Sequence, residues 1–275
     1  MTRTDLGRTD FRAPRLYLVD RLKAGADIEL DRAAANYLRN VLRLKSGDSV
    51  RLFNGKDGEW RATLSTNGKR ALVVQVGEQT RTQPTPADLQ YLFAPLKHAR
   101  LDYVVQKAVE LGVSKLQPVI TQHTQVSRVN LDRMQANVIE AAQQCGVLNL
   151  PEVAKPVEFK ALVSRFAPER MLIFCDEDAA VKDPVAALAA VRSPPSALVP
   201  VDAPAPVTPL AVLIGPEGGF GEEERAALLK LPNVVRLALG PRILRADTAA
   251  VAALALVQAV LGDWPVPAES RAKKK

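Results

Sequence analysis

The sequence predicts an α/β protein of two domains, a small β-barrel followed by a mainly parallel α/β domain. Residues 1–80 contain short alternating or β-branched runs around one helical segment, which is typical of a small barrel. From residue 88 onward, apolar runs of strand length alternate with helical patterns, which is typical of a parallel sheet. We place the domains at residues 1–80 and 87–265, on either side of a polar, proline-bearing stretch, and expect residues 266–275 to form a disordered basic tail.

The first domain is expected to contain four strands and one helix. The helix is expected over residues 31–42, with Asp31 as its N-cap and an apolar stripe that includes Leu38 and Val41. Three basic residues lie on its polar side or just after it, and we interpret them either as RNA phosphate contacts or as a solvated face. They are Arg39, Arg43 and Lys45. The strands are expected at residues 15–19, 49–53, 59–65 and 71–76.

The second domain is expected to contain five buried strands with helices between them. One helix should end at Gly112, and another should run from an Asn130 cap to Gly146. A stretch with six prolines at residues 193–209 predicts an exposed loop. The strands are expected at residues 89–94, 116–120, 171–175, 210–214 and 234–239.

The last helix, expected over residues 248–261, is apolar on nearly every side. Such a helix must be covered all round, either by the sheet and its neighbours or by a second subunit. We favour the second subunit and therefore expect a homodimer.

The positive charge of the chain is concentrated in its first domain. The whole sequence carries 37 Lys and Arg against 30 Asp and Glu, a net charge of +7. Residues 1–86 hold sixteen of these cations and ten of these anions, net +6, which leaves twenty-one against twenty, net +1, for the remainder. This distribution favours a polyanion such as RNA as the partner of the first domain, although scattered solvated side chains explain many such counts.

Several chemistries are disfavoured by composition. Two histidines and two well-separated cysteines give no metal-ligand spacing, and a serine-hydrolase GxSxG motif is absent, so no metal is expected. Cys145 and Cys175 are expected to be buried, reduced thiols. The sequence contains no apolar stretch of membrane-spanning length and no signal-peptide pattern, so we expect a cytoplasmic protein without a membrane partner.

Two loops carry the pattern of a ligand site, because each follows a strand and contains glycine. The first reads LIGPEGGFG at residues 213–221, with three glutamates opening the next helix. Glycines at the carboxyl end of a strand let a ligand approach the backbone, and the glutamates disfavour a phosphate there. The second reads LALGPRILRADT at residues 237–248, where Asp247 or Thr248 is expected to cap the last helix.

At these residues the chain resembles the bacterial 16S ribosomal RNA uridine-N3 methyltransferase family, which belongs to the knotted SPOUT class. The matching segments are LIGPEGGF at 213–220 and LGPRILRADTAA at 239–250, supported by QKAVELGV at 106–113 and NVLRL at 40–44. Ala246 and Asp247 depart from the Thr and Glu that are common in the family, and Val147 stands where many members have Arg.

The resemblance implies a PUA-like barrel, a trefoil-knotted SPOUT methyltransferase domain and a homodimer. It also implies that S-adenosylmethionine binds among three loops, at residues 94–97, 213–219 and 237–244. The implied cofactor-binding residues are Leu96, Leu213, Gly215, Pro216, Glu217, Gly218, Gly219, Leu237, Leu239, Gly240, Ile243 and Leu244.

The implied reaction is methylation of a uridine N3 in 16S ribosomal RNA, in the context of the small ribosomal subunit. Arg245 would stabilise negative charge on the uracil, Asp247 would accept a proton or orient Arg245, and Arg242 would contact RNA. Two alternatives remain open at this point. One is a knotted methyltransferase that acts on transfer RNA or on another ribosomal RNA position, and the other is a non-catalytic RNA-binding or ribosome-assembly protein.

Overall fold

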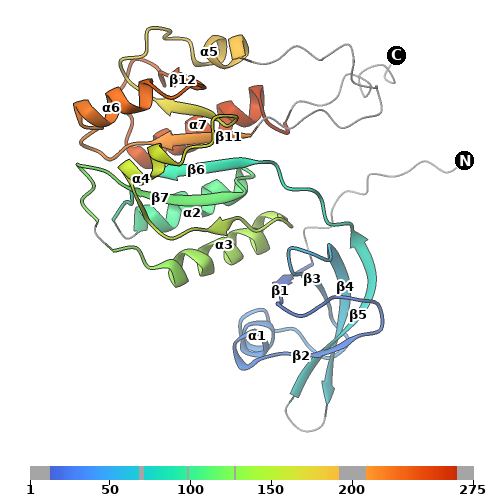
Figure 1. Ribbon diagram of the computed structural model, residues 1–275. Coiled ribbons are helices and arrows are strands. Elements are labelled where there is room, and N and C mark those ends of the chain that lie inside the picture. The colour runs from blue at the N-terminus through green and yellow to red at the C-terminus, as the bar shows by residue number, and fades with distance from the viewer. Residues whose placement is uncertain (1–12, 68–70, 98, 127, 192–208, 265–275) are drawn as a thin grey trace, which may run out of the picture. The chain divides into compact units, whose positions relative to one another are not determined.

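The computed structural model describes residues 13–67, 71–97, 99–126, 128–191 and 209–264, in two compact units (Figure 1). Unit 1 comprises residues 1–85 together with 142–150, and unit 2 comprises residues 86–141 and 151–275. No sequence pattern assigned residues 142–150 to the first unit. The expected proline-rich loop, apart from Pro209, and the expected basic tail lie outside the described residues. None of the helices in these ranges has the length and apolarity needed to cross a membrane.

Unit 1 is built on one sheet with the strand order β1-β3-β4-β5-β2. β1 runs parallel to β3, and the other neighbours are antiparallel. Alternate residues such as Val50 and Leu52 point into the apolar core of this unit. β2 was not expected, because three residues carry no readable period. The strands are β1 (Arg15–Tyr17), β2 (Asp27–Glu29), β3 (Ser49–Phe53), β4 (Glu59–Asn67) and β5 (Ala71–Arg81).

The helical segment of unit 1 changes type half-way along. Asp31 caps α1 (Arg32–Asn36) by accepting a 2.7 Å hydrogen bond from the Ala34 N–H, as predicted. The prediction of a continuous α-helix up to residue 42 is wrong, because a π-helix, η1 (Tyr37–Val41), follows α1. A π turn contains more residues than an α turn, so it rotates the later side chains out of the predicted stripe. Val41 is accordingly 61% exposed, whereas Leu38 is fully buried.

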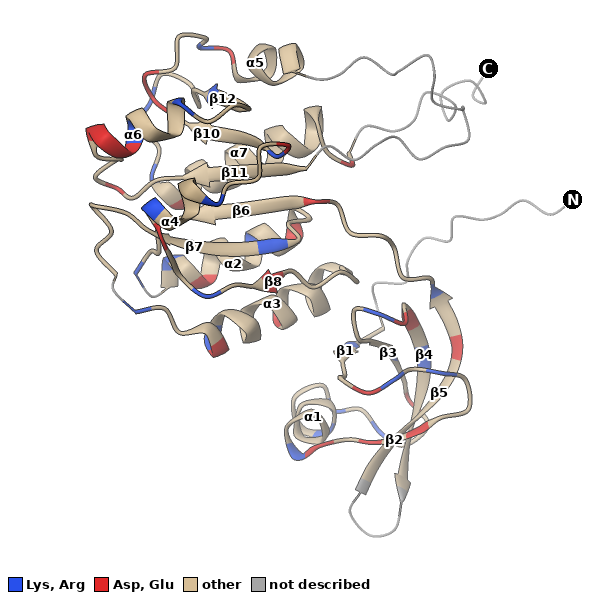
Figure 2. Ribbon diagram, viewed as in Figure 1, with Lys and Arg blue, Asp and Glu red and all other residues tan. Residues whose placement is uncertain are grey.

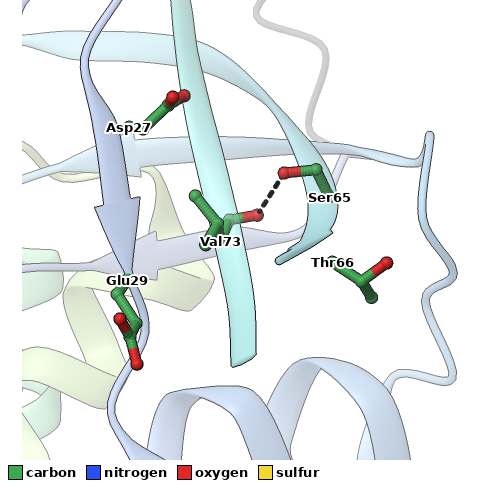
Figure 3. Close-up of a pocket in the computed structure, with 5 residues that line it drawn as sticks. All are labelled: Asp27, Glu29, Ser65, Thr66 and Val73. Carbon is green, nitrogen blue, oxygen red and sulfur yellow. Dashed lines mark hydrogen bonds between the residues drawn. The ribbon is translucent and has the colours of Figure 1, made fainter. Parts of the chain in front are cut away.

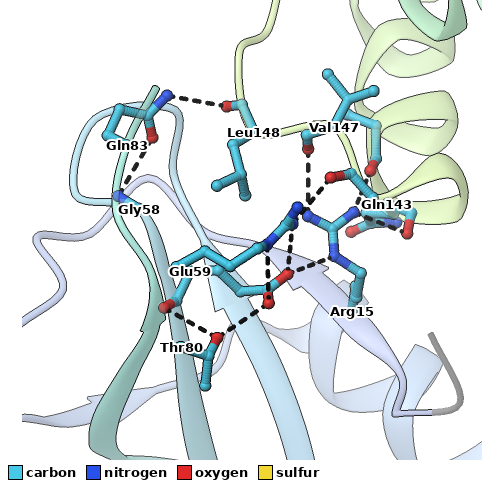
Figure 4. A network of polar contacts seen from close by, with 11 residues as sticks. Arg15, Gly58, Glu59, Thr80, Gln83, Gln143, Val147 and Leu148 are labelled. Atoms are coloured by element: carbon cyan, nitrogen blue, oxygen red, sulfur yellow. Dashed lines mark hydrogen bonds and ion pairs between the residues drawn. The ribbon is translucent and has the colours of Figure 1, made fainter. Parts of the chain in front are cut away.

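A buried ionic network holds residues 142–150 in unit 1 (Figure 4). The Glu59 carboxylate accepts hydrogen bonds from Arg15 Nε at 2.8 Å and from Arg81 Nη2 at 2.9 Å. Both guanidinium groups also donate to backbone carbonyls at the end of α3 (Leu131–Cys145) and in the turn after it. These carbonyls lie at the negative end of the helix dipole and have no partner within the helix. They belong to Ala142, Gln143, Gly146 and Val147.

We predict that Glu59→Gln destabilises unit 1 by about 3–5 kcal/mol, because it leaves the buried Arg15 and the half-buried Arg81 without a counter-charge. Burial alone would raise the pKa of Glu59, but hydrogen bonds from Arg81, Arg15 and Thr80 outweigh it and lower that pKa. A lowered pKa in the folded state means that this stabilisation is present above the ordinary carboxyl pKa. It is lost as the pH falls through the folded-state pKa.

Urea unfolding at several pH values, followed by fluorescence in a Trp264→Phe background so that Trp60 reports on unit 1, measures this effect. The matched control is Glu78→Gln, because Glu78 pairs with Arg61 while both side chains are more than half exposed. The control should lose no more than about 1 kcal/mol. Equal losses for the two variants, or a Glu59→Gln curve with unchanged pH dependence, would contradict the role of the network.

Unit 2 contains a seven-stranded sheet in which every described pairing is parallel. The strand order is β12-β10-β11-β6-β7-β8, with β9 paired to β7. β10 and β11 have the predicted bounds, while the two-residue strands β8 and β9 were not expected. The strands are β6 (Leu89–Phe93), β7 (Lys115–Ile120), β8 (Glu152–Val153), β9 (Val157–Glu158), β10 (Met171–Cys175), β11 (Leu210–Ile214) and β12 (Val234–Leu237).

Helices cover both faces of this sheet (Figure 1). Phe159 of α4 and Leu228 of α6 share a core cluster with Leu92 and Leu213 on one face. α2 and α7 pack against each other, and α7 also contacts β11. Gly112 and Gly146, both with positive φ, follow α2 and α3 as predicted. Besides α3, the helices are α2 (Ala99–Glu110), α4 (Phe159–Ser164), α5 (Pro184–Val191), α6 (Glu222–Leu229) and α7 (Ala246–Val260).

The start of α7 differs from the prediction. Its N-cap is Arg245, not Asp247 or Thr248. Asp247 lies inside the first turn, where its Oδ1 accepts a 2.9 Å hydrogen bond from the Thr248 N–H. Only one side of α7 is fully buried within the chain, at positions such as Ala250, Leu254 and Val257, while residues such as Leu256 are half-buried.

Candidate functional site

The three expected ligand loops all lie at one edge of the unit 2 sheet. Because β6, β11 and β12 are parallel to their neighbours, their carboxyl ends share that edge. Ile214 is paired with Phe93, so the loops after β11 and β6 start side by side. The loop after β12 starts one strand further away, because β10 lies between β11 and β12. The chain thus gathers residues 94–97, 215–221 and 238–245 from distant parts of the sequence.

Most of the predicted apolar cofactor residues in these loops have their side chains in the core. Leu96, Leu213 and Leu237 are each no more than 3% exposed, and Pro216 is buried as well. These residues can offer a ligand only their backbone groups. Leu239 and Leu244 are half-buried and retain some accessible side-chain surface. A ligand that binds here must therefore be held largely by backbone N–H and carbonyl groups.

Packing requires a glycine at the start of the β11 loop. A Cβ atom on Gly215 would lie 2.7 Å from the Phe220 ring, closer than side chains approach one another. The ring itself is fixed, because it packs edge-on against Phe174 at 5.4 Å and near Phe159 at 6.1 Å. Phe220 thus folds the loop back over Gly215. Beyond this point the loop is open, and Glu217, Gly218 and Gly219 are exposed.

A fourth loop, which follows β7, supports the β11 loop. His123 Nδ1 lies 3.1 Å from the carbonyl oxygens of Gly218 and Gly219, so this nitrogen carries the hydrogen and donates it. The Glu224 carboxylate accepts from the Gln122 N–H at 2.9 Å and from the Gly221 N–H at 3.0 Å. This support was not predicted from the sequence, although His123 follows a predicted strand. The β11 loop is therefore held at its open end as well as at its base.

The loop after β12 is more exposed than the other loops. Gly240 has a φ of +91°, and Ile243 is 93% exposed. Arg242 and Arg245 are exposed, and within the described residues neither side chain makes a hydrogen bond or ion pair. The structure therefore does not place Arg245 in contact with Asp247, which is half-buried in the first turn of α7.

An ionic cluster at the end of β10 was also missed. The buried carboxylate of Asp176 accepts from Arg236 Nε of β12 at 2.7 Å and from Arg225 Nη2 of α6 at 3.1 Å. Burial alone would raise the pKa of Asp176, but bonds from Arg236, the Asp178 N–H and Arg225 outweigh it and lower the pKa. The cluster joins β10, β12 and α6, so it fixes the spacing of the strands from which the ligand loops emerge.

Cys175 does not supply a nucleophile. Burial raises the pKa of the Cys175 thiol to about 12, so the group at the carboxyl end of β10 stays protonated. The expectation that both cysteines are buried is wrong, because Cys145 lies exposed in the last turn of α3 and Cys175 is only half-buried. Among the described residues, no cluster of three or more His, Cys, Asp and Glu side chains is arranged for a metal ion.

The predicted RNA-contact residues of unit 1 lie around the π-helix. Arg39, Arg43 and Lys45 are all exposed. Arg43 has a φ of 58°, which places a non-glycine residue in the strained left-handed region just after Leu42, the C-cap of η1. Basic residues occur along this segment and on the strands of the unit (Figure 2). Two backbone irregularities in succession give this basic turn a defined shape, and such irregularities concentrate at functional sites.

A depression elsewhere on unit 1 has the opposite character (Figure 3). It has a volume of about 430 Å³, and Asp27 and Glu29 of β2 contribute two carboxylates to its wall. Ser65, Thr66 and Val73 complete the lining. Two carboxylates would repel a phosphate group, so this depression is not a site for the RNA backbone.

The comparisons with known proteins agree with this geometry. Residues 83–258 match the family of RNA methyltransferase domains, and residues 30–77 match the PUA domain of RNA methyltransferases. The ribosomal RNA small subunit methyltransferase E of Rickettsia conorii is 31% identical over 245 residues, which cover 89% of this chain and 94% of that protein. The protein of the same name from Synechocystis is 32% identical over 241 residues, which cover 86% and 74% of the two chains.

A solved structure is similar over nearly the whole length. The ribosomal RNA small subunit methyltransferase E of Neisseria gonorrhoeae, crystallised bound to S-adenosyl methionine, is 27% identical, with a TM-score of 0.75. The match covers 92% of this chain and 100% of that chain. The fold and the site thus define an RNA methyltransferase with an α/β catalytic domain and a PUA domain. Within that class, the chain belongs to the ribosomal RNA small subunit methyltransferase E family, as its loop motifs predicted.

Proposed function

We propose that this enzyme transfers a methyl group from S-adenosylmethionine to N3 of a specific uridine in the 16S ribosomal RNA of the small subunit. The observation that carries the proposal is the β11 loop. Its exposed glycine backbone at residues 218–219 lies at the carboxyl edge of a parallel sheet, beside the loop after β6. A family member with the same fold was crystallised bound to S-adenosyl methionine.

The residues at this edge fit such a cofactor. S-adenosylmethionine, when bound, supplies a methyl group on a positively charged sulfur. The three glutamates that open α6 give the loop a negative charge that suits a cation, while Glu217 is paired with Arg100 at 3.1 Å. Backbone groups suit the adenosine, because the nearby leucine side chains are buried. The proposed binding residues are Leu96, Leu213, Gly215, Pro216, Glu217, Gly218, Gly219, Leu237, Leu239, Gly240, Ile243 and Leu244.

Gly218→Val should weaken S-adenosylmethionine binding about tenfold or more, because overpacking costs about 1–3 kcal/mol. A Cβ atom on Gly218 would lie 3.3 Å from the Cβ of His123, so a branched side chain must displace His123 and the loop. Calorimetric titration of the purified protein with S-adenosylmethionine measures the change. Wild-type affinity in this variant would exclude the loop from the cofactor site.

The double variant Gly218→Val with His123→Gly separates two causes of the loss. Recovery of affinity would show that crowding against His123 distorts the loop. No recovery would show that the valine occupies the space of the cofactor itself. The single variant His123→Gly is the control for the lost hydrogen bond to the loop.

The chemistry on uracil sets the roles of Arg245 and Asp247. Neutral uracil carries a proton on N3, and methylation requires that proton to leave, which puts negative charge on the two carbonyl oxygens. Arg245 is exposed and without an internal partner in the described structure, so its guanidinium is available to donate hydrogen bonds to those oxygens. Asp247, two residues further on, accepts the proton directly or through water.

We predict that Arg245→Ala lowers the methyl-transfer rate by about 10²–10³ while the affinity for S-adenosylmethionine stays within about twofold. Transfer of labelled methyl to 16S ribosomal RNA gives the rate, and mass spectrometry of the nucleosides identifies the product. The matched control is Arg242→Ala, an exposed arginine of the same loop that should weaken RNA binding more than turnover. A product other than N3-methyluridine would refute the proposed reaction, and near-wild-type turnover would remove Arg245 from it.

A homodimer and a trefoil knot belong to the same proposal. The half-buried face of α7 and the nearly fully exposed Ile243 are apolar surfaces that a second copy of the chain would cover. The knot would thread the segment around the β12 loop and α7, as in the SPOUT class. Because ribosomal RNA is the proposed substrate, we place the enzyme in the cytoplasm, acting within the small subunit.

We propose that the basic turn at the π-helix, Arg39, Arg43 and Lys45, holds the RNA backbone, together with Arg242 of unit 2. The double variant Arg39→Ala with Arg43→Ala should reduce the slope of log affinity against log salt by about one to two, because each phosphate contact contributes about 0.7–0.9. RNA binding measured across a salt series tests this. Arg21→Ala with Lys23→Ala removes the same charge from exposed positions of unit 1 and should leave the slope closer to wild type. Equal effects of the two double variants would indicate that RNA responds to the overall positive charge of unit 1 and not to a defined site.

A further inference from the structure

Three arginines lie side by side on the face of the unit 1 sheet that points away from the apolar core. Arg15 of β1 is paired with Arg51 of β3, and Arg51 is paired with Arg61 of β4. Residues paired across neighbouring strands project from the same face of a sheet. Val50 and Leu52, which flank Arg51 in the chain, point into the core instead. The three guanidinium groups therefore start from adjacent positions across three strands.

Two glutamates near this row form ion pairs with arginines other than Arg51. Glu59 is paired with Arg15 and Arg81, and both guanidinium groups are held further by backbone carbonyls. Glu78 is paired with Arg61 at 2.6 Å. Around Arg51 the face thus carries four arginines against these two glutamates, and neither carboxylate contacts Arg51. Asp27 and Glu29 also project from this face, but they lie on β2, three strands away from β3.

Arg51 itself is enclosed and has no partner among the described residues. It is 8% exposed, and its Nη1 is buried with no hydrogen-bond partner. Within the described residues, its side chain makes no ion pair with a carboxylate. A guanidinium stays charged at physiological pH, so it cannot remove this mismatch by losing a proton. Buried polar groups in proteins are nearly always satisfied, and a buried charge without a partner is costly.

An anion from outside the chain resolves the mismatch, and phosphate fits the surroundings. A guanidinium binds phosphate through parallel hydrogen bonds. Ser49 and Thr63, which are paired with each other two residues further along the same face, are exposed and offer hydroxyl donors. The neighbouring Arg61–Glu78 pair is half exposed on both sides, so Arg61 can exchange that carboxylate for a phosphate at little cost.

We propose that Arg51, assisted by Arg61, forms a second phosphate-binding site on unit 1 and takes a backbone phosphate of the RNA substrate. The site is distinct from the basic turn at Arg39 and Arg43, which belongs to the π-helix segment instead of the sheet. The inference rests on the proposed function, because it takes ribosomal RNA as the partner of unit 1. It adds a contact that no charge count reveals, since Arg51 is buried in the free protein.

A buried charge without a partner destabilises the free protein, whereas an arginine with a partner in the fold stabilises it. Arg51→Met, which keeps the length of the stem and removes the charge, should raise the melting temperature of the free protein. The same variant should reduce the slope of log RNA affinity against log salt by about 0.7–0.9, or about threefold in affinity between 50 and 200 mM salt. Arg21→Met removes an exposed charge from the same unit and serves as the matched control, with neither effect expected at this size.

Full-length protein, a 16S ribosomal RNA fragment and inorganic phosphate are the materials of the test. Phosphate should raise the melting temperature of the wild type more than that of Arg51→Met, which shows an anion site without RNA. A lower melting temperature for Arg51→Met would mean that the arginine has a structural partner, and an unchanged salt slope would mean that RNA does not reach it. Either result overturns the inference. If Arg51→Met does not fold, the inference is likewise overturned, and Arg51→Lys then shows whether charge alone restores folding.

The proposed function can fail separately. If the wild type binds the RNA fragment without salt dependence, or transfers no methyl group to 16S ribosomal RNA either free or within the small subunit, the assignment of ribosomal RNA as substrate is wrong. A phosphate effect that depends on Arg51 would then still show an anion site, with free phosphate as its ligand. If the wild type binds RNA and Arg51→Met binds with an equal slope, only the second site is refuted.

Discussion

Parallel pairing of the central strands is the constraint on which the ligand site depends. Backbone hydrogen bonds between β6, β11, β10 and β12 fix four carboxyl ends at one edge of the sheet. Segments more than a hundred residues apart in the sequence, such as residues 94–97 and 215–221, therefore emerge next to each other. The Asp176 cluster reinforces this arrangement at the edge, because its carboxylate joins Arg236 of β12 to Arg225 of α6. The loops can then differ freely in sequence while their starting points stay fixed.

The glycines of the β11 loop show that one motif can combine packing and binding requirements. Gly215 is required by the Phe220 ring, which is anchored in the aromatic cluster below the loop. Gly218 leaves room for His123, whose Nδ1 hydrogen holds the loop from the side of β7. The residues that build the support thus lie mostly outside the motif. A loop fixed in this way presents its backbone groups without reorganisation, which suits the cofactor site proposed for it.

Long apolar strands were predictable from the sequence, whereas short or irregular elements were not. β10 and β11 have the predicted bounds, because five consecutive apolar residues between polar segments leave little choice. β8 and β9, with two residues each, have no period to detect. The π-helix after α1 depends on tertiary packing around Leu38, which the sequence pattern does not reveal. The predicted α-helix therefore extended beyond the end of α1.

The site was predictable to a similar degree. The two glycine loops were found because strand-loop-helix patterns are local, and their motifs resemble a known family. His123 and Asp176 were missed, because each acts through partners that are distant in sequence: Gly218 for His123, and Arg225 for Asp176. Asp247 was misplaced as a cap by two residues, since Asp is favoured at both the N-cap and the first turn of a helix.

The net charge of unit 1 overstates how many of its cations are available to bind a polyanion. Two of its sixteen cations, Arg15 and Arg81, hold the end of α3 and share the charge of Glu59. Residues 142–150, which complete the unit, contain no charged residue to offset them. What decides the interaction is which cations lack an internal partner, and that property is visible only in the fold. Arg39 and Arg43 satisfy it because they are exposed on an irregular turn, and Arg51 satisfies it although it is buried. The sign of the charge on unit 1 favours a polyanion as its partner, while the ion pairs within the fold show which cations remain available for the proposed contacts.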